Sequence, residues 1–296
     1  MKRVEKQNHI YAMSAKNEAV LRVESGERVL FETCDCFTDQ IKLATDTFES
    51  LDWDRINPAT GPIYIVGAEV GDILAIDIEK ITIAARGVVA TGDGLGVLGE
   101  FFPENHITFA EIDEEFVYFE DLKIPLNKMV GVIGTAPAGA EISCGTPADH
   151  GGNMDTKIIT EGTRLYLPVH IAGGLLAMGD LHACMGDGEV GVSGLEVSGE
   201  VIVRVEVLKG STIPTPAVEN LEIFSTIASH ADINIAITMA TKAMADYIVA
   251  QTGRSLASAT QLLSLAGNLR IGQVVDPNKT VRMEIAREFL ATKGMR

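Results

Sequence analysis

Two short segments of the chain concentrate the side chains that could do chemistry. They cover residues 149–157 and 178–190, and both place acids and histidine among glycines. Glycine allows the backbone to approach a ligand closely, while Asp, Glu and neutral His bind metal ions and transfer protons. Asp180 and His182 are two residues apart, so they would lie on one face of an extended strand. These segments indicate a metal site or an acid/base site.

The second segment carries another pair with the same spacing, Asp187 and Glu189. Neither pair matches an established metal motif such as H-E-x-x-H or the loop of an EF-hand. Spacing alone therefore leaves a solvated surface turn as an equal alternative to a functional site.

Strands are the elements that the sequence predicts around these segments. Apolar and polar residues alternate in several windows of residues 1–210, which is the pattern of a half-buried strand. These windows are 74–79, 164–171 and 201–207. Pro168 cannot donate a backbone hydrogen bond, so it predicts an edge strand or a bulge. A turn around Gly26 predicts a hairpin between residues 20–23 and 28–33.

Helices are predicted only in the last part of the chain, residues 211–296. Asp232 is placed to cap a helix whose apolar residues follow a 3.6-residue spacing. Gly253 is placed to end that helix in the left-handed conformation. A second helix over 255–266 and two short strands follow.

These elements predict a β-rich α+β fold. An antiparallel, β-sandwich-like core would take up residues 1–210. A C-terminal α/β segment, the α+β tail of residues 211–296, would pack on that core, and residues 1–296 would form a single domain. The 29 glycines and 10 prolines fit many strands joined by tight turns.

The composition argues against several classes of partner. A hydrophobic fraction of 46% and a charged fraction of 22% are typical of globular proteins, and the formal net charge of −17 repels nucleic acid and anionic membrane surfaces. The sequence shows neither the apolar run of a signal peptide nor a stretch long enough to span a membrane. Four cysteines without C-x-x-C pairing predict reduced thiols. We therefore expect a cytoplasmic protein with no nucleic-acid and no membrane partner.

The polar segments and their surroundings resemble the acetamidase/formamidase family in order and spacing, over nearly the whole chain. The motifs that carry the resemblance are Cys34-Asp35-Cys36, Gly67-Ala68-Glu69-Val70-Gly71-Asp72, Gly151-Gly152-Asn153-Met154-Asp155, Leu165-Tyr166-Leu167-Pro168-Val169, Gly179-Asp180-Leu181-His182-Ala183, Gly186-Asp187-Gly188-Glu189-Val190 and Gly267-Asn268-Leu269-Arg270-Ile271.

The resemblance implies hydrolysis of a short aliphatic amide, formamide or acetamide, to ammonia and a carboxylate. It also implies a divalent metal, with zinc as the first choice and calcium as the alternative. A zinc ion held by three protein groups lowers the pKa of its bound water to about 7, which supplies hydroxide at neutral pH. At the matching positions we expect Asp35, Asp155 and His182 to hold the metal.

The remaining roles fall to other residues of the same motifs. Glu189 or Asp187 would take a proton from water and return it to the amide nitrogen. Asn153 would donate a hydrogen bond to the developing oxyanion. The alternative for Asn153 and Asp155 is a glycine-rich turn held by bonds from side chain to backbone, and for Glu189 and Asp187 it is a solvated turn.

Two other functions stay open at this point. A metal-free cysteine amidase is conceivable because Cys184 follows His182 closely. A non-catalytic β-sandwich binding module with structural calcium is the other alternative. For the amidase, the small substrate predicts a narrow pocket, and we expect a homodimer or a higher homo-oligomer with closed symmetry.

Overall fold

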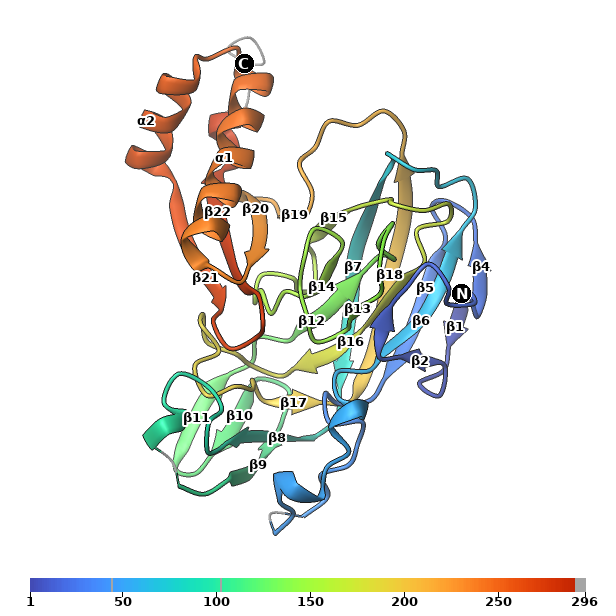
Figure 1. Ribbon diagram of the computed structural model, residues 1–296, viewed down its shortest axis with the longest axis vertical. Helices are drawn as coiled ribbons and strands as arrows, with labels where there is room; N and C mark the ends of the chain where they lie inside the picture. The colour runs from blue at the N-terminus through green and yellow to red at the C-terminus, as the bar shows by residue number, and fades with distance from the viewer. Residues whose placement is uncertain (44, 102, 291–296) are drawn as a thin grey trace.

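The computed structural model describes residues 1–43, 45–101 and 103–290. Strands predominate, and two helices lie near the C-terminal end (Figure 1). The first sheet has nine strands, in the order β1 (Lys2–Val4), β5 (Arg28–Thr33), β18 (Gly199–Leu208), β7 (Ile73–Ile83), β15 (Arg164–Pro168), β19 (Ala217–Glu219), β20 (Ile223–His230), β22 (Lys279–Ala286) and β21 (Asn268–Gln273).

The second sheet has eleven strands, and a small two-stranded sheet accompanies it. The order of the second sheet is β11 (Leu122–Pro125), β10 (Phe116–Phe119), β9 (His106–Ile112), β8 (Arg86–Thr91), β17 (Glu196–Val197), β16 (Leu176–His182), β12 (Met129–Gly134) and β14 (Gly151–Asn153), with β6 (Ala59–Ile65) joining β16 to β2 (His9–Ile10) and β4 (Leu21–Val23). The small sheet pairs β13 (Ile142–Ser143) with β3 (Ala12–Met13). Short 3-10 helices are Phe48–Ser50, Trp53–Arg55, Gly99–Phe101 and Arg287–Leu290.

The main core lies between the two large sheets. Leu74, Ile76 and Ile78 alternate along β7 and are at most 1% exposed, as the spacing predicts. They pack in one cluster with apolar residues of the opposite sheet, including Ile63 on β6 and Leu176 on β16. Each such side chain contributes about 1.5–3 kcal/mol when it is fully buried. The β-sandwich-like core is confirmed, and most of its strand pairs are antiparallel.

The helices of the tail begin and end where the sequence predicts. In α1 (Ile233–Thr252) the Asp232 side chain accepts a hydrogen bond from the backbone N–H of Asn234, and Gly253 ends the helix with a φ of 68°. Ser255 caps α2 (Leu256–Ala266) through the N–H of Ser258. Within the described ranges, neither helix is both long and apolar enough to cross a bilayer.

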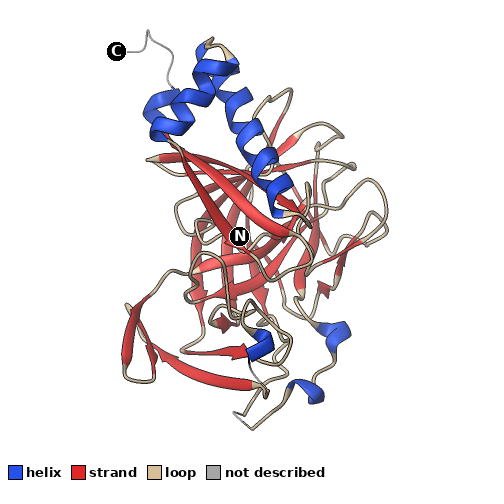
Figure 2. Cartoon of the chain, turned by 60° about the vertical axis from the view of Figure 1, so that its left-hand side comes forward, coloured by secondary structure: helices blue, strands red, loops and turns tan. Residues whose placement is uncertain are grey.

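The tail shares a sheet with the core. Its strands β19, β20, β22 and β21 extend the nine-stranded sheet beyond β15, and α1 packs on β20 and β22 (Figure 2). The buried face of α1 carries Ala240, Met244 and Ile248, which lie in a second apolar cluster with Phe224 and Met283. This arrangement brings β22 and the turn before it towards the polar segment after β16.

Two local predictions are wrong. The segments on either side of Gly26 do not form a hairpin, because β4 pairs with β6 in one sheet while β5 pairs with β1 and β18 in the other. Gly26 has the positive φ of a turn, 89°, but this turn carries the chain from one sheet to the other. Val23 and Val29 therefore enter the same core from opposite sheets. Pro168 is not on an edge strand: β15 lies between β7 and β19, and Pro168 is its last residue.

Candidate active site

His182, at the end of β16, lies in the middle of a buried group of acids. The imidazole is 1% exposed. Its Nε2 lies 3.2 Å from Glu196 Oε1, 3.4 Å from Asp180 Oδ1, 3.8 Å from Asp155 Oδ1 and 4.0 Å from Glu189 Oε1. We refer to these five residues as the acidic cluster.

Four chain segments bring the acidic cluster together. Asp180 and His182 project from β16 with the predicted two-residue spacing, and Glu196 on β17 is the direct cross-strand partner of His182. Asp155 follows β14, and Glu189 lies in the connection from β16 to β17. Asp155, Asp180 and Glu189 have φ values of 36°, 57° and 46°. Such left-handed backbone costs a residue other than glycine about 1–2 kcal/mol, and three acids of the cluster carry this cost.

Two glycines make room for the cluster. A Cβ at Gly131 on β12 would overlap the Asp155 carboxylate and lie 2.7 Å from Asp180 Oδ2. A Cβ at Gly194 would lie 2.6 Å from His182 Nδ1. Both distances are below any real contact of a Cβ, so these positions require glycine if the cluster keeps its geometry.

Burial controls the protonation of the cluster. Removal from water raises the pKa of the Glu196 carboxyl to about 7, against the opposing attraction of His182. Burial also raises the pKa of Glu189 and of Asp155 well above the ordinary range, and neighbouring carboxylates add to the effect. Burial lowers the pKa of His182, but Glu196 and Asp180 outweigh it, so the pKa of the imidazole is raised well above its usual value.

Several polar atoms at the site have no hydrogen-bond partner among the described residues. They are Asn153 Oδ1, Asp155 Oδ1, Asp180 Oδ1, His182 Nδ1 and Glu196 Oε2. A buried carboxylate without a partner is costly, and a bound cation would offset that cost. The donor set thus fits a metal ion.

The potential ligands form two groups of three, in each of which the ligand atoms lie within 4.8 Å of one another. The first group is Asp155, His182 and Glu189, and the second is Cys36, Asp180 and Glu196. Two of the three residues predicted to hold the metal, Asp155 and His182, are thus together. No spacing in the sequence indicates Cys36 or Glu196 as a ligand, and only the two-residue spacing from His182 indicates Asp180.

Asp35, the third predicted ligand, belongs to neither group. Its carboxylate accepts a hydrogen bond from the backbone N–H of Asp39, at 2.8 Å. Burial raises the pKa of Asp35 to about 6. Its neighbour Cys36 supplies the thiol that reaches the second group.

Asn153, the predicted oxyanion donor, lies beside the cluster. Its Nδ2 donates a hydrogen bond to Asp276 Oδ2 at 2.9 Å. Asp276 comes from the turn between β21 and β22, and burial together with the charge of Glu189 raises the pKa of its carboxyl well above the ordinary value. No spacing in the sequence connects Asp276 with Asn153, 123 residues away.

Asp187 lies outside the acidic cluster. Arg282 on β22, which is 2% exposed, donates two hydrogen bonds to it, at 2.7 and 2.9 Å. Burial opposes ionisation of Asp187, but Arg282 outweighs this and holds the pKa of the carboxyl below its usual range. The ion pair makes Asp187 a poor proton acceptor and fixes the loop that carries Glu189.

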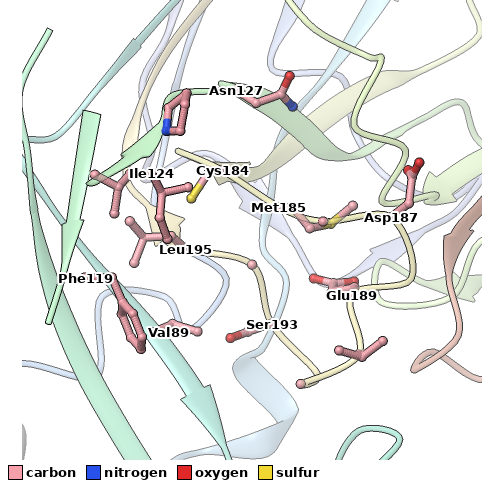
Figure 3. Close-up of a pocket in the computed structure, with 16 residues that line it drawn as sticks. Val89, Phe119, Ile124, Asn127, Cys184, Met185, Asp187, Glu189, Ser193 and Leu195 are labelled. Carbon is pink, nitrogen blue, oxygen red and sulfur yellow. The ribbon is translucent and has the colours of Figure 1, made fainter. Parts of the chain in front are cut away.

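A cavity of about 520 Å³ adjoins the cluster (Figure 3). Apolar side chains including Phe119, Ile124 and Leu195 line one side of it, and Glu189 lies at the other. This cavity is larger than the narrow pocket expected for a small amide substrate.

Cys184 lines the same cavity, but it lacks the features of an activated nucleophile. Burial raises the pKa of its thiol. Across the described ranges, no hydrogen bond joins the thiol to His182, which a cysteine amidase would need.

Hydrolytic enzymes use buried carboxylates and imidazoles beside a cavity to bind metal ions and to transfer protons. Comparison with known proteins agrees with this class. The profile of the Acetamidase/Formamidase family matches residues 15–144 and 140–290. The chain belongs to this family.

Individual relatives support the assignment. An acetamidase structure from Bacillus halodurans is 44% identical, with a TM-score of 0.96 over 97% of this chain and 98% of that one. An acetamidase structure from Yersinia enterocolitica is 31% identical, with a TM-score of 0.92 over 98% and 93%. A formamidase of Methylophilus methylotrophus is 26% identical over 252 residues, 64% of this chain and 61% of the relative. The chain thus spans about 61% of the length of that curated relative.

Proposed function

We propose that this protein hydrolyses short aliphatic amides such as formamide and acetamide with the help of a bound divalent metal. The family supports the substrate class, and it argues against a non-catalytic binding module. The observation that carries the proposal is the acidic cluster, in which four carboxylates are buried around His182. In the reaction water adds to the carbonyl carbon, the C–N bond breaks, and the nitrogen leaves with its electron pair and takes up a proton.

Zinc is the metal that the donor atoms favour. Calcium is bound by oxygen ligands, whereas zinc accepts imidazole nitrogen and thiolate sulfur beside carboxylate oxygen. His182 and Cys36 therefore argue for zinc over calcium. Asp155 and His182 would hold the ion together with a donor from the group of Cys36, Asp180 and Glu196. A catalytic zinc site has three protein ligands and one open position.

The protein's own residues would handle the proton and the oxyanion. The metal, when bound, supplies Lewis acidity and lowers the pKa of water. We assign proton transfer to Glu189, because among the described members of the cluster it is the one that also lines the cavity. Its raised pKa makes Glu189 a stronger base than an ordinary carboxylate, which favours uptake of a proton from water. Asn153 uses one N–H on Asp276 and keeps the second for the substrate oxygen.

Ammonia release from acetamide and formamide tests the proposal. The purified protein should release ammonia, lose the activity on dialysis against a chelator, and regain it with zinc but not with calcium. A sample freed of metal, as verified by elemental analysis, that keeps full activity would show that the metal part is wrong. Absence of ammonia release in the zinc-loaded protein would contradict the substrate class.

The molecule is also proposed to form a homodimer or a higher homo-oligomer. Apolar side chains on the helical tail support this, because Ile235 and Met239 on α1 and Leu256 and Leu265 on α2 are 44–86% exposed. Light scattering should give a mass at least twice the 31.6 kDa of the chain. A mass of one chain across the working range of concentration would contradict it.

A cytoplasmic location is the last part of the proposal. All four cysteines, Cys34, Cys36, Cys144 and Cys184, are free thiols, which suits a reducing compartment. Cell fractionation should recover the activity with cytoplasmic markers.

A further inference from the structure

The cavity beside the acidic cluster has an extended apolar wall. Strands β8, β10 and β11 contribute Val89, Val117, Phe119 and Ile124 to this wall, and Leu195 completes it from the connection before β17. Met185 and Gly194 also line the cavity. The wall is thus built by the part of the second sheet that projects at the lower left of Figure 1.

The cavity adjoins the reacting groups directly. Glu189 belongs both to the cluster and to the cavity lining (Figure 3). Gly194 lines the cavity on one side and lies against the His182 ring on the other, since a Cβ there would be 2.6 Å from Nδ1. If the carbonyl of a substrate amide is bound at the acidic cluster, an acyl group that extends past Glu189 enters the cavity.

The volume exceeds what the acyl part of acetamide needs. At about 520 Å³ the cavity falls within the range of about 300 to 1,000 Å³ in which proteins hold drug-sized ligands. Acetamide contributes a single methyl group to it. An apolar chain or ring, by contrast, would be removed from water against Phe119, Ile124 and Leu195.

We propose that this cavity binds the acyl group of the substrate, and that the enzyme prefers linear amides whose acyl group is apolar and larger than acetyl. The inference rests on the proposed amide hydrolysis, and it refines the substrate class of that same site. Ile124 and Phe119 determine acyl-chain length, because they form the wall opposite Glu189.

Ile124 is the position at which the cavity can be filled with least damage to the fold. It is half-buried on β11, an edge strand whose one neighbour within the described part of the sheet is β10. The substitution Ile124→Trp would occupy part of the cavity. Leu122→Trp is the matched control, because Leu122 is on the same strand, is 55% exposed and does not line the cavity.

The experiment measures kcat/KM of the zinc-loaded protein for acetamide, butyramide, hexanamide and benzamide. Each methylene that enters the cavity should raise kcat/KM by about fourfold, the equivalent of its burial free energy of about 0.8 kcal/mol. Ile124→Trp should lower kcat/KM for hexanamide and benzamide at least tenfold more than it lowers kcat/KM for acetamide. Leu122→Trp should match the unchanged protein on all four amides.

Calorimetric binding of hexanamide to the metal-free protein separates this inference from the proposed function. Hexanamide binding that Ile124→Trp abolishes supports the acyl cavity even if no amide is hydrolysed, in which case the proposed function fails alone. Hydrolysis of acetamide with a kcat/KM that falls steadily from acetamide to hexanamide, and no binding of hexanamide, overturns the acyl cavity and leaves the proposed function intact. An effect of Leu122→Trp equal to that of Ile124→Trp also overturns it.

Discussion

At the scale of single residues, His182 compensates the charge of the acidic cluster. Its ring is the one imidazole within 4.0 Å of Asp155, Asp180, Glu189 and Glu196 in the described ranges. Removal of the ring takes away a metal donor and the positive partner of four acids at once. Changes at the other members remove one donor each and leave the imidazole in place.

The substitution His182→Ala should therefore abolish both metal binding and activity. Glu189→Gln should keep the metal and lower kcat by about 10²–10⁴-fold, because the amide cannot accept and return a proton. Elemental analysis and kcat for acetamide measure the two effects. His230→Ala, on β20 and outside the cluster, serves as the control and should change neither. If Glu189→Gln empties the site, Glu189 is a ligand and another group carries the proton.

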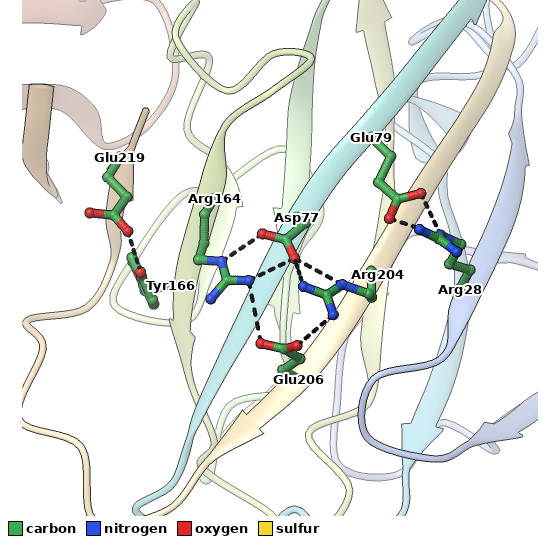
Figure 4. Close-up of polar contacts among 8 residues, drawn as sticks. All are labelled: Arg28, Asp77, Glu79, Arg164, Tyr166, Arg204, Glu206 and Glu219. Carbon is green, nitrogen blue, oxygen red and sulfur yellow. Dashed lines mark hydrogen bonds and ion pairs between the residues drawn. The ribbon is translucent and has the colours of Figure 1, made fainter. Parts of the chain in front are cut away.

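At the scale of elements, charged side chains connect three neighbouring strands of the nine-stranded sheet (Figure 4). Asp77 on β7 accepts hydrogen bonds from Arg164 on β15, at 2.5 and 2.8 Å, and from Arg204 on β18, at 2.9 Å. Glu206 forms ion pairs with both arginines. The polar positions of the alternating strands thus form a continuous ion-pair network on the face away from the core.

The network predicts a pH-dependent loss of stability in Asp77→Asn. Burial raises the pKa of Asp77, but Arg164 and Arg204 outweigh this and lower it below the usual value. A lowered pKa stabilises the fold at pH values above the unfolded pKa of about 3.9, and that contribution is lost as the pH falls through the folded pKa. Asp77→Asn should thus lower the free energy of unfolding by about 1–2 kcal/mol at pH 7, allowing for solvent screening, and by less below about pH 4.

Urea denaturation at pH 7 and pH 3.5 measures this difference. Asp246→Asn is the control, because Asp246 forms one exposed pair with Lys242 and should contribute little at either pH. A loss of stability in Asp77→Asn that is the same at both pH values would contradict an electrostatic origin.

Strand β22 supports the loop that carries Glu189. Arg282 donates two hydrogen bonds to Asp187 and one, at 2.6 Å, to Glu284. The backbone N–H of Gly188 adds a hydrogen bond to Gly272 O at 2.7 Å. The tail therefore fixes the position of Glu189 although it contributes no ligand in either potential metal group.

The substitution Arg282→Met should lower the free energy of unfolding by about 3–5 kcal/mol, because it leaves Asp187 and Glu284 without their buried partner. It should also lower kcat more than it raises KM, because Glu189 loses its fixed position. Arg270→Met on β21, where Arg270 is largely exposed, should have a small effect on both. Urea denaturation and steady-state kinetics on acetamide measure the outcome. If Arg282→Met is destabilised but keeps its kcat, the hydrogen bonds of Arg282 stabilise the fold without positioning Glu189.

At the scale of the whole molecule, metal binding and stability should be coupled through the cluster. Burial raises the pKa of Glu196 to about 7 and the pKa of Asp155 and Glu189 well above the ordinary range. A carboxyl group whose pKa is higher in the folded state than in the unfolded state stabilises the fold at pH values below its unfolded pKa of about 4. This contribution is lost as the pH rises through the folded pKa. The metal-free protein should therefore lose stability between pH 5 and pH 8.

A bound cation would keep the same carboxylates ionised in the folded state, so the metal-loaded protein should lose much less stability over that range. Midpoints of urea denaturation at pH 5, 6.5 and 8, with and without chelator, measure the difference. Parallel pH dependence of the two forms would contradict the coupling of metal and cluster.

Local features of the sequence are sufficient to predict the class of fold and the pairing of Asp180 with His182. Alternation along β7 and β18, the capping residue Asp232 and the terminal Gly253 are local features, and each acts on its own few residues in the structure as it does in a peptide. The pair Asp180 and His182 is equally local, because a two-residue spacing on a strand fixes a shared face.

Long-range strand pairing and packing bring the distant residues to that pair. Glu196 reaches His182 through the pairing of β16 with β17, and Cys36 and Asp276 arrive from opposite ends of the chain. Asp187 looked equivalent to Glu189 in the sequence, yet a contact across 95 residues with Arg282 removes it from the cluster. The predicted hairpin at Gly26 is wrong for a related reason. Burial against the whole core selects strand partners, and proximity along the chain does not.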